Sequence, residues 1–354
     1  MLDLYAEYLI SSFSYTTATG LSEMTEGQIS HDRVSRFLNE DVCTGKMLWK
    51  IVKPIIRKLE SEAGFVVFDD TIEEKPYTDE NEIVAWHYDH SKGRSLKGIN
   101  IVNALYVNDQ CCLPINYDIV SKTKIIIDEK TGKEKRISEE TKNEKYRRML
   151  GQIVKNGIKF RYVLNDVWYA SAENMVYVKE TIKKDFIMPV KSNRKVSLSR
   201  ADQRQQRFVS VSTLALKKGT VQEVYLEDVT FPILLCKQIF KNEDGTTGEL
   251  YLVSSNKSIT YDLMAEFYKR RWKIEEFHKS LKNNVSLAKS QTRVQRTQRN
   301  HIFACMYAFI KLELLKMKTH LNHFAIKASI YAKAVKVAFE ELQNLNGLHI
   351  TLAR

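Results

Sequence analysis

Short apolar runs between positions 65 and 166 predict the first part of an α/β fold. Each run is typical of a short, largely buried strand. The predicted strands cover 65–70, 99–107, 113–120 and 160–166. A charged amphipathic stretch, 139–155, predicts a helix before the fourth strand. The first run ends on Asp69 and Asp70 and the fourth ends on Asp166, so two strands are expected to stop at an acid.

Residues 268–282 predict a helix with one charged face and one apolar face. At about 100° per residue, four side chains fall within about 60° of one another. They are Tyr268, Arg271, Glu275 and Lys282. The opposite face carries an apolar stripe of Leu263, Ile274, Phe277 and Leu281, which would dock the helix on a core. A carboxylate held among cations suits metal-dependent phosphate chemistry, although a solvated helix with charge pairs is the simpler alternative.

The predicted order of strand, strand, strand, helix and strand is the order of a ribonuclease-H-like core. In that core the first and fourth strands lie side by side and present their terminal acids together. A helix bearing a third acid, here Glu275, completes the cluster. Each acid alone would be an ordinary cap or turn residue, but the three in this order predict a site.

These motifs resemble those of DDE transposases of the insertion-sequence group with a Y-(2)-R-(3)-E-(6)-K signature, which includes the transposon-five enzyme. The segment 69–71 resembles the first-acid motif and 165–169 the second. The segment 268–282 matches the signature with every gap intact. The resemblance covers most of the chain.

The resemblance implies that Asp70, Asp166 and Glu275 form the catalytic triad. The family register selects Asp70 and Glu275 over the adjacent acids Asp69 and Glu276. Chemistry alone leaves Asp69 open as the first acid.

Three acids in one site call for a cation. Carboxylates about 4 Å apart repel by about 4 kcal/mol at an effective dielectric near 20, which raises one or more of their pKa values. Oxygen ligands without nearby His or Cys favour Mg²⁺ or Mn²⁺ over Zn²⁺. Two such ions per site, roughly 3.5–4 Å apart, can activate a water and stabilise the leaving 3′ oxygen of a DNA strand.

The other signature residues suit DNA contacts. Arg271 and Lys282 are expected to bind phosphates near the scissile bond, and Tyr268 can donate a hydrogen bond to the same backbone. Trp272 either stacks on an unpaired base or packs the helix, and the sequence does not decide between these roles.

Basic residues outside the core suggest further DNA contacts. Residues 21–38 resemble a helix-turn-helix with Ser30 as N-cap, in which Arg33 and Arg36 could face DNA. A capped helix in a small bundle is the alternative. Several strand-like runs between 183 and 256 predict a β-rich insertion. The basic turn 191–195, with Lys191 and Arg194, and a later basic track that includes Arg293, could also contact DNA.

Composition agrees with a polyanionic partner. The chain has 354 residues, 55 Lys and Arg against 43 Asp and Glu, and a net charge of +12, which predicts salt-sensitive binding. Five Cys without a CxxC motif form neither a disulfide framework nor a zinc site. The start of the chain lacks the pattern of a signal peptide, and the apolar stretch 301–317 contains Lys311 and Glu313. We therefore expect a cytoplasmic, nucleoid-associated prokaryotic protein without a membrane segment.

Together these patterns predict a cut-and-paste DNA transposase that acts on terminal inverted repeats and target DNA, as a homodimer in its DNA complex. The alternatives are a ribonuclease-H-like nuclease without strand transfer and an inactive DNA-binding regulator. The fold expected is α/β, with a ribonuclease-H-like catalytic core, a β-rich insertion, and helical regions at both ends. The expected segments are an N-terminal helical DNA-binding region (1–60), the first core part (61–182), the insertion (183–256), the second core part (257–320) and a C-terminal helical segment (321–354).

Overall fold

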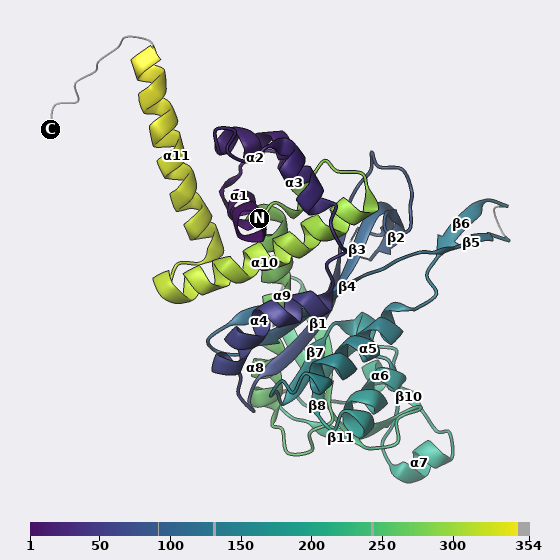
Figure 1. The fold of residues 1–354 in the computed structure, drawn as a ribbon. Coiled ribbons are helices and arrows are strands. Elements are labelled where there is room, and N and C mark those ends of the chain that lie inside the picture. The colour runs from purple at the N-terminus through teal and green to yellow at the C-terminus, as the bar shows by residue number, and fades with distance from the viewer. Residues whose placement is uncertain (91, 130–131, 242–243, 346–354) are drawn as a thin grey trace. The chain divides into compact units, whose positions relative to one another are not determined.

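The computed structural model describes residues 1–90, 92–129, 132–241 and 244–345 (Figure 1). They fall into two compact units. We call residues 44–277 the sheet unit, and residues 1–43 with those from 278 onward the helical unit. The last residues of the predicted C-terminal helical segment, 346–354, lie outside the described residues.

The sheet unit contains eleven described strands in one mixed sheet and a separate two-stranded hairpin. The strands are β1 (Phe65–Glu74), β2 (Ala85–Asp89), β3 (Arg94–Val107), β4 (Cys112–Ile119), β5 (Lys124–Ile127), β6 (Glu134–Ile137), β7 (Tyr162–Asn165), β8 (Asp185–Val190), β9 (Lys195–Ser197), β10 (Val209–Ser210), β11 (Gln222–Leu226), β12 (Ile233–Lys241) and β13 (Thr247–Ser254). The helices are α4 (Gly45–Leu59), α5 (Lys142–Lys155), α6 (Ala172–Val176), α7 (Arg200–Arg204), α8 (Tyr261–Lys269) and the start of α9 (Trp272–Asn283), with short turns η1 (Val167–Tyr169), η2 (Tyr177–Thr181) and η3 (Val211–Thr213).

The centre of the sheet has the strand order β4-β3-β1-β7-β8. β3 pairs antiparallel with both β1 and β4, whereas β7 pairs parallel with β1 and with β8. This arrangement is consistent with the ribonuclease-H-like DDE fold. The predicted order of three strands, a helix and a fourth strand is confirmed by β1, β3, β4, α5 and β7, although the short β2 also lies between β1 and β3.

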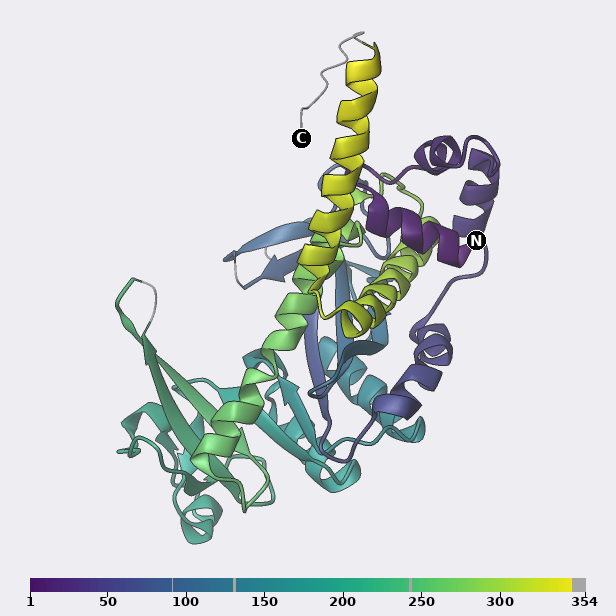
Figure 2. The ribbon, with the colours of Figure 1, turned by 90° about the vertical axis from the view of Figure 1, so that its left-hand side faces the viewer.

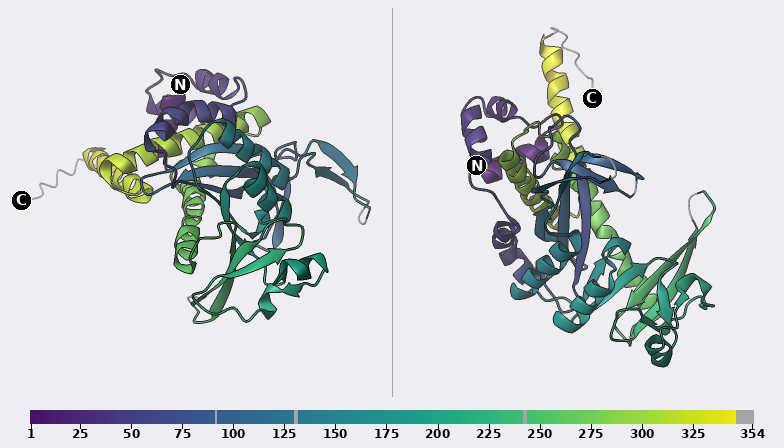
Figure 3. Two further views of the ribbon diagram at one scale, coloured as in Figure 1. Left: turned by 90° about the horizontal axis from the view of Figure 1, so that it is seen from below. Right: turned by 90° about the vertical axis from the view of Figure 1, so that its right-hand side faces the viewer.

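Helices cover both faces of this central sheet (Figures 2 and 3). Successive residues of a strand point to opposite faces, so neighbouring positions of β1 contact different helices. Phe68 of β1 packs against Tyr146 of α5, with ring centroids 4.5 Å apart. Phe65 of the same strand packs against Phe267 of α8, with centroids 5.2 Å apart. The odd and even positions of β1 therefore face α8 and α5 respectively.

The region predicted as a β-rich insertion, 183–256, contains strands β8 to β13. β13 pairs antiparallel with β8, so the insertion extends the central sheet. One of the strand-like runs in this region, 208–214, forms less strand than its apolar residues predict, because only Val209–Ser210 is extended and the chain then forms η3.

The first predicted strand is also wrong at its end. β1 does not stop at Asp70 but continues to Glu74, because β3 pairs with it along its whole length, up to Glu74 opposite Gly98. A Cβ atom at Gly98 would lie 2.3 Å from the carbonyl oxygen of Glu73, so a glycine permits this close pairing. The two acids therefore lie inside the strand, whereas Asp166 directly follows β7 as predicted.

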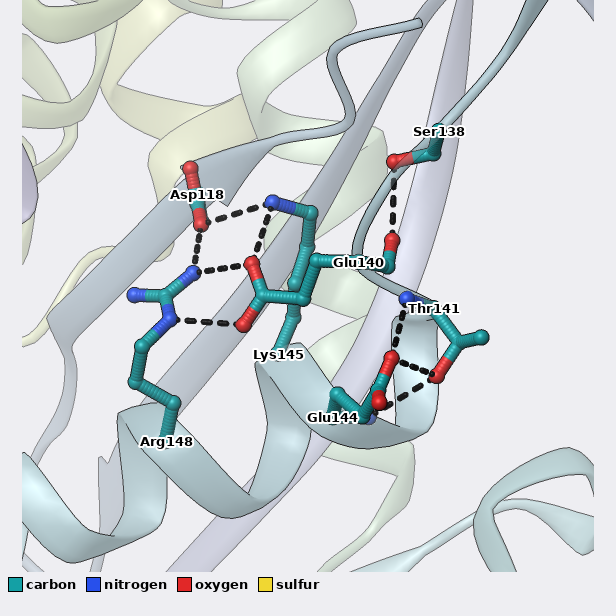
Figure 4. A network of polar contacts seen from close by, with 7 residues as sticks. All are labelled: Asp118, Ser138, Glu140, Thr141, Glu144, Lys145 and Arg148. Atoms are coloured by element: carbon teal, nitrogen blue, oxygen red, sulfur yellow. Dashed lines mark hydrogen bonds and ion pairs between the residues drawn. The ribbon is translucent and has the colours of Figure 1, made fainter.

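The first turn of α5 is fixed by side-chain hydrogen bonds (Figure 4). Thr141 and Glu144 form a reciprocal capping box. Glu140 accepts hydrogen bonds from Arg148 Nε at 2.7 Å and from Lys145 Nζ at 2.9 Å, and these bonds, that of Arg148 first, lower the pKa of Glu140 to about 2. Lys145 also contacts Asp118 of β4 at 3.2 Å. This network fixes the helix start, and with it the position of the next residue after the cap, Lys142.

The buried His87 of β2 is expected to make the folded sheet unit less stable as the pH falls. The side chain is buried, and burial, together with the charges of Lys122 and Lys142, lowers its pKa to about 4. An unfolded chain with an ordinary histidine pKa near 6.5 takes up the proton first as the pH falls. We therefore expect the free energy of unfolding to fall by about 2 kcal/mol between about pH 7 and about pH 5.

Urea unfolding at the two pH values measures this effect. His87→Leu should lose that part of the pH dependence, whereas His31→Leu, at an exposed position of the helical unit, should keep it. An unchanged pH dependence in His87→Leu would show that the acid sensitivity has another source.

The helical unit contains α1 (Leu2–Ser11), α2 (Ala18–Met24), α3 (His31–Leu38), the end of α9, η4 (Leu287–Lys289), α10 (Gln295–Thr319) and α11 (His323–Leu345). α10 is buried along most of its length and packs against α1, where Tyr5 Oη and His301 Nδ1 are 3.0 Å apart. The predicted N-cap is confirmed, since Ser30 accepts a hydrogen bond from the amide of Arg33. None of the helices among the described residues has both the length and the apolar character that a membrane crossing requires.

Candidate active site

Asp69 and Asp70 are neighbours in β1, so their side chains point to opposite faces of the sheet. Asp69 lies on the face covered by α8 and the start of α9. Its carboxylate oxygen belongs to a group of ligand-type side chains that also includes Glu275 and whose ligand atoms lie within 4.8 Å of one another. The structure therefore brings Asp69, rather than Asp70, to Glu275.

Asp70 is held by three neutral or cationic side chains on the other face. Lys142 Nζ lies 3.0 Å from both carboxylate oxygens. Tyr169 donates its hydroxyl hydrogen at 2.8 Å, and Asn100 donates from Nδ2 at 2.8 Å. The charge of Asp70 is thus balanced within the protein by Lys142.

Asp166 caps the short turn η1 that follows β7. Its Oδ1 accepts hydrogen bonds from the amides of Trp168 at 3.0 Å and Tyr169 at 3.4 Å. Burial, followed by the charge of Asp70, raises the pKa of Asp166 above its ordinary value, against the effect of these hydrogen bonds. The carboxylate is therefore fixed in position, in surroundings that disfavour its ionised form.

The pKa of Asp69 is raised in the same direction as that of Asp166. Burial raises the pKa of Asp69 well above its ordinary value, and the charges of Asp166, Asp70 and Glu275 raise it further. Three carboxylates are thus close enough to Asp69 to disfavour its ionised form. Arg271 Nη1 lies 4.0 Å from Asp69 Oδ2.

The signature segment is not one helix, as the sequence predicted, but two. α8 ends at Lys269 and α9 begins at Trp272. Between them the amide of Arg271 donates to the carbonyl of Tyr268 at 2.9 Å, a spacing of three residues that tightens the turn. The helical periodicity used for the prediction therefore fails at this junction.

The side chains of the signature nevertheless meet across the break. Arg271 Nη1 lies 3.0 Å from Glu275 Oε1, and its guanidinium lies 5.8 Å from the centre of the Tyr268 ring. Tyr268 donates its hydroxyl hydrogen to the carbonyl of Asn165, at the end of β7, at 3.4 Å. Burial raises the pKa of Tyr268, so the phenol stays protonated as a donor. The signature is thus tied to the strand that precedes Asp166.

The predicted apolar stripe is correct except at one position. Ile274, Phe277 and Leu281 are buried, whereas Leu263, which lies in α8 before the break, is exposed. Trp272 is 61% exposed, so it does not serve the packing role that the sequence left open.

Comparison with known families decides the class of this protein. The family model described as DDE superfamily endonuclease matches residues 2–208, more than half of the chain. The chain belongs to the DDE superfamily endonucleases. This membership implies phosphodiester hydrolysis, and DDE endonucleases typically use divalent metal ions. No curated protein matches the sequence.

A solved structure, the Drosophila P element transposase strand transfer complex, shows a weaker likeness to this DDE endonuclease. The similarity covers 47% of this chain and 33% of that chain, with 10% sequence identity and a TM-score of 0.24. At these values the likeness supports no conclusion about fold or function.

A hard divalent cation fits the donor set of this DDE endonuclease. Asp69 and Glu275 offer carboxylate oxygens within 4.8 Å, and burial together with neighbouring carboxylates raises the pKa values of Asp69 and Asp166.

The remaining predicted DNA-binding residues of the DDE endonuclease lie at or near the surface. Arg33, Arg36 and Arg293 of the helical unit are exposed, and Lys282 of α9 is partly exposed. In the sheet unit, Lys191 is exposed and Arg194 partly buried in the turn after β8, where the amide of Arg194 donates to the carbonyl of Lys191 at 2.9 Å.

Three residues that contact Asp70 were not predicted from the sequence. Lys142, Tyr169 and Asn100 contact its carboxylate, but they come from α5, η1 and β3. Tyr169 had a signal, since it lies in the segment that resembles the second-acid motif. Lys142 and Asn100 had none, because only the pairing of β1 with β3 and the position of α5 bring them to Asp70.

Proposed function

We propose that this DDE endonuclease is a cut-and-paste DNA transposase of the Y-R-E-K group, which cleaves DNA at terminal inverted repeats and transfers the cut strand to target DNA. The observation that carries the proposal is the grouping of Asp69, Asp166, Arg271 and Glu275 at the central strands, together with the intact spacing of the signature. Membership of the DDE endonuclease family supports cleavage of DNA. The Y-R-E-K signature supports transfer of the cut strand to target DNA.

Two acids compete for the first position of the proposed triad. The family resemblance selects Asp70, with Asp166 and Glu275. The geometry favours Asp69, because Asp69 faces Glu275 and carries unbalanced charge, whereas Lys142 already neutralises Asp70. We propose Asp69, Asp166 and Glu275 as the metal-binding acids and Asp70 as the group that fixes Lys142 and Tyr169 beside them.

Mg²⁺, which Mn²⁺ can replace, would be held by these three acids and would supply an activated water and a stabilised leaving oxygen. The chain itself binds and orients the DNA. Arg271 presents a guanidinium next to Glu275, where its planar fork can hold a phosphate of the strand being cut. Tyr268 positions Arg271 through ring contact and ties the segment to β7.

The proposed DNA contacts outside the site follow from charge and exposure. Arg33 and Arg36 lie on the exposed face of α3, in the region proposed to bind the repeat ends. Lys191, Arg194, Lys282, Arg293 and the exposed Trp272 are proposed to contact the same or the target DNA. The five segments expected from the sequence remain our proposed domain boundaries.

The homodimer implied by the resemblance has a candidate surface on α11. Exposed apolar residues continue along this helix, including Val337, Phe339, Leu342 and Leu345. Such a surface is typical of a helix that packs against another chain. We propose α11 as the dimer contact in the DNA complex.

A strand-transfer assay distinguishes the proposal from its alternatives. The chain is incubated with Mg²⁺, a supercoiled plasmid and either an uncut or a precut repeat end. Cleavage of the uncut end and covalent joining of the 3′ end to the plasmid are scored. We expect joined products. Cutting without joining would indicate a nuclease, and binding of the repeat ends without cutting would indicate a regulator.

A further inference from the structure

Four exposed aromatic or imidazole rings lie in the sheet unit beside the acids. They are Trp86, Tyr88, His90 and Trp168, which we call the aromatic strip. Trp86, Tyr88 and Trp168 are 51%, 55% and 45% exposed, although rings of this size are usually more buried. The proposed chemistry of the acids uses none of the four.

The alternation of side chains along β2 explains why the rings of Trp86 and Tyr88 are exposed together. Trp86 and Tyr88 alternate in β2 with the buried Ala85 and His87, so both rings stand on the same face of the strand. Positions two residues apart in a strand are separated by about 7 Å. The buried His87 fixes the strand on one face, while the other face presents its rings to solvent.

Ring contacts connect β2 to the active-site turn. The rings of Tyr88 and His90 have centroids 4.8 Å apart, and those of His90 and Trp168 are 4.9 Å apart. Trp168 lies two residues after Asp166 and donates its amide hydrogen to that carboxylate at 3.0 Å. Ring contacts therefore connect Tyr88 of β2, through His90, to Trp168, the residue whose amide fixes Asp166.

Cations accompany the rings along the strip. Lys142 Nζ lies 4.9 Å from the centre of the Trp168 ring and 3.0 Å from Asp70, so one ammonium group joins the strip to the acids. Lys97 of β3 stands opposite Trp86 in the antiparallel register and on the same face. Rings interleaved with cations are the recognised pattern of single-strand binding, in which bases stack on the rings and phosphates contact the cations.

We propose that the aromatic strip binds unpaired bases of a DNA strand that leads into the active site. Paired bases in a duplex present only their edges, so rings can stack only on bases that have left the helix. Counted outward from Asp166, such a strand would contact Trp168 first and Tyr88 next. This inference rests on the proposed function, because it requires DNA at the acids.

Binding of a tailed DNA duplex tests the inference on the full chain. The probe has a single-stranded tail that contains a fluorescent adenine analogue, and a blunt duplex serves for comparison, both without Mg²⁺ so that no cutting occurs. For Trp168→Ala and Tyr88→Ala we expect the affinity for the tailed probe to fall by about 5-fold to about 100-fold. Affinity for the blunt duplex should stay within about 2-fold, and quenching of the analogue should be lost.

Matched variants separate stacking from folding. Trp168→Phe and Tyr88→Phe keep a ring and should restore most of the affinity and the quenching. Phe240→Ala removes a 48% exposed ring from β12, which is separated from β2 in the sheet by β13, β8, β7, β1 and β3, and should change nothing. The ring of Tyr88 contacts that of His90, which in turn contacts Trp168. The Tyr88 variant therefore tests the strip even if Trp168→Ala disturbs Asp166.

Each other outcome overturns the inference. Alanine variants that bind the tailed probe as well as the unaltered chain, or that lose both probes equally, would show that the rings do not stack on unpaired bases. A changed oligomeric state in Tyr88→Ala would assign the strip to contact between copies. If the unaltered chain cuts duplex DNA while the variants keep tail binding, only this inference fails; if it binds no DNA, the proposed function fails as well.

Discussion

Replacement of Glu275 by Gln is expected to lower the rate of Mg²⁺-dependent DNA cleavage by about 1,000-fold or more, equivalent to about 4 kcal/mol of transition-state stabilisation. The substitution keeps the size of the side chain and one acceptor oxygen, but it removes the charge and replaces the second oxygen by an NH₂ donor. Glu275 is the α9 acid whose oxygen lies within 4.8 Å of that of Asp69, so its charge is required to hold a shared cation. The measurement is the initial rate of cleavage of a repeat-end duplex.

The adjacent acid provides the control. Glu276 is exposed and pairs with Lys273 at 2.8 Å, away from Asp69. Glu276→Gln should therefore cut at nearly the unaltered rate, since an exposed pair of this kind contributes about 0–1 kcal/mol. Equal rates for Glu275→Gln and the unaltered chain would place the site elsewhere.

The second large effect separates Asp69 from Asp70. Asp69→Asn is expected to abolish binding of Mn²⁺, measured by the electron paramagnetic resonance signal of the free ion, because it removes the carboxylate that faces Glu275. Asp70→Asn is expected to retain Mn²⁺ binding. It should instead lower the free energy of unfolding by about 1–3 kcal/mol, because Lys142 loses its charged partner in a partly buried position.

The two substitutions are isosteric and adjacent, so each controls for the other. Loss of Mn²⁺ binding in Asp70→Asn, with retention in Asp69→Asn, would establish the assignment implied by the family resemblance and refute the one based on geometry. Loss in both would make both carboxylates ligands and release Lys142 from Asp70 when the metal binds.

The order of the core elements was predictable because buried strands and helices have recognisable patterns of apolar residues in the sequence. β1, β3, β4 and β7 all appear as apolar runs, and α5 as an amphipathic stretch. Where β1 ends was not predictable from its own residues. Pairing with β3 continues the strand through Asp69 and Asp70 to Glu74, although acids usually mark the end of a strand.

The site was predictable in residue type but not in orientation. The signature spacing identified Glu275 and Arg271, which contact each other at 3.0 Å. The preference for Asp70 over Asp69 depends on which face of β1 carries the helix with Glu275, and only the packed structure provides that information. The break between α8 and α9 was hidden because the segment has strong helical periodicity on both sides of Arg271.

The most direct test of the account is cleavage of a DNA fragment that carries the repeat ends, by the unaltered chain and by Asp166→Asn, with Mg²⁺ and without divalent metal. The account predicts that the unaltered chain cuts at the repeat ends only with Mg²⁺, and that Asp166→Asn binds the same DNA but does not cut it. Equal cutting by both chains, or cutting by the unaltered chain without any divalent metal, would contradict it.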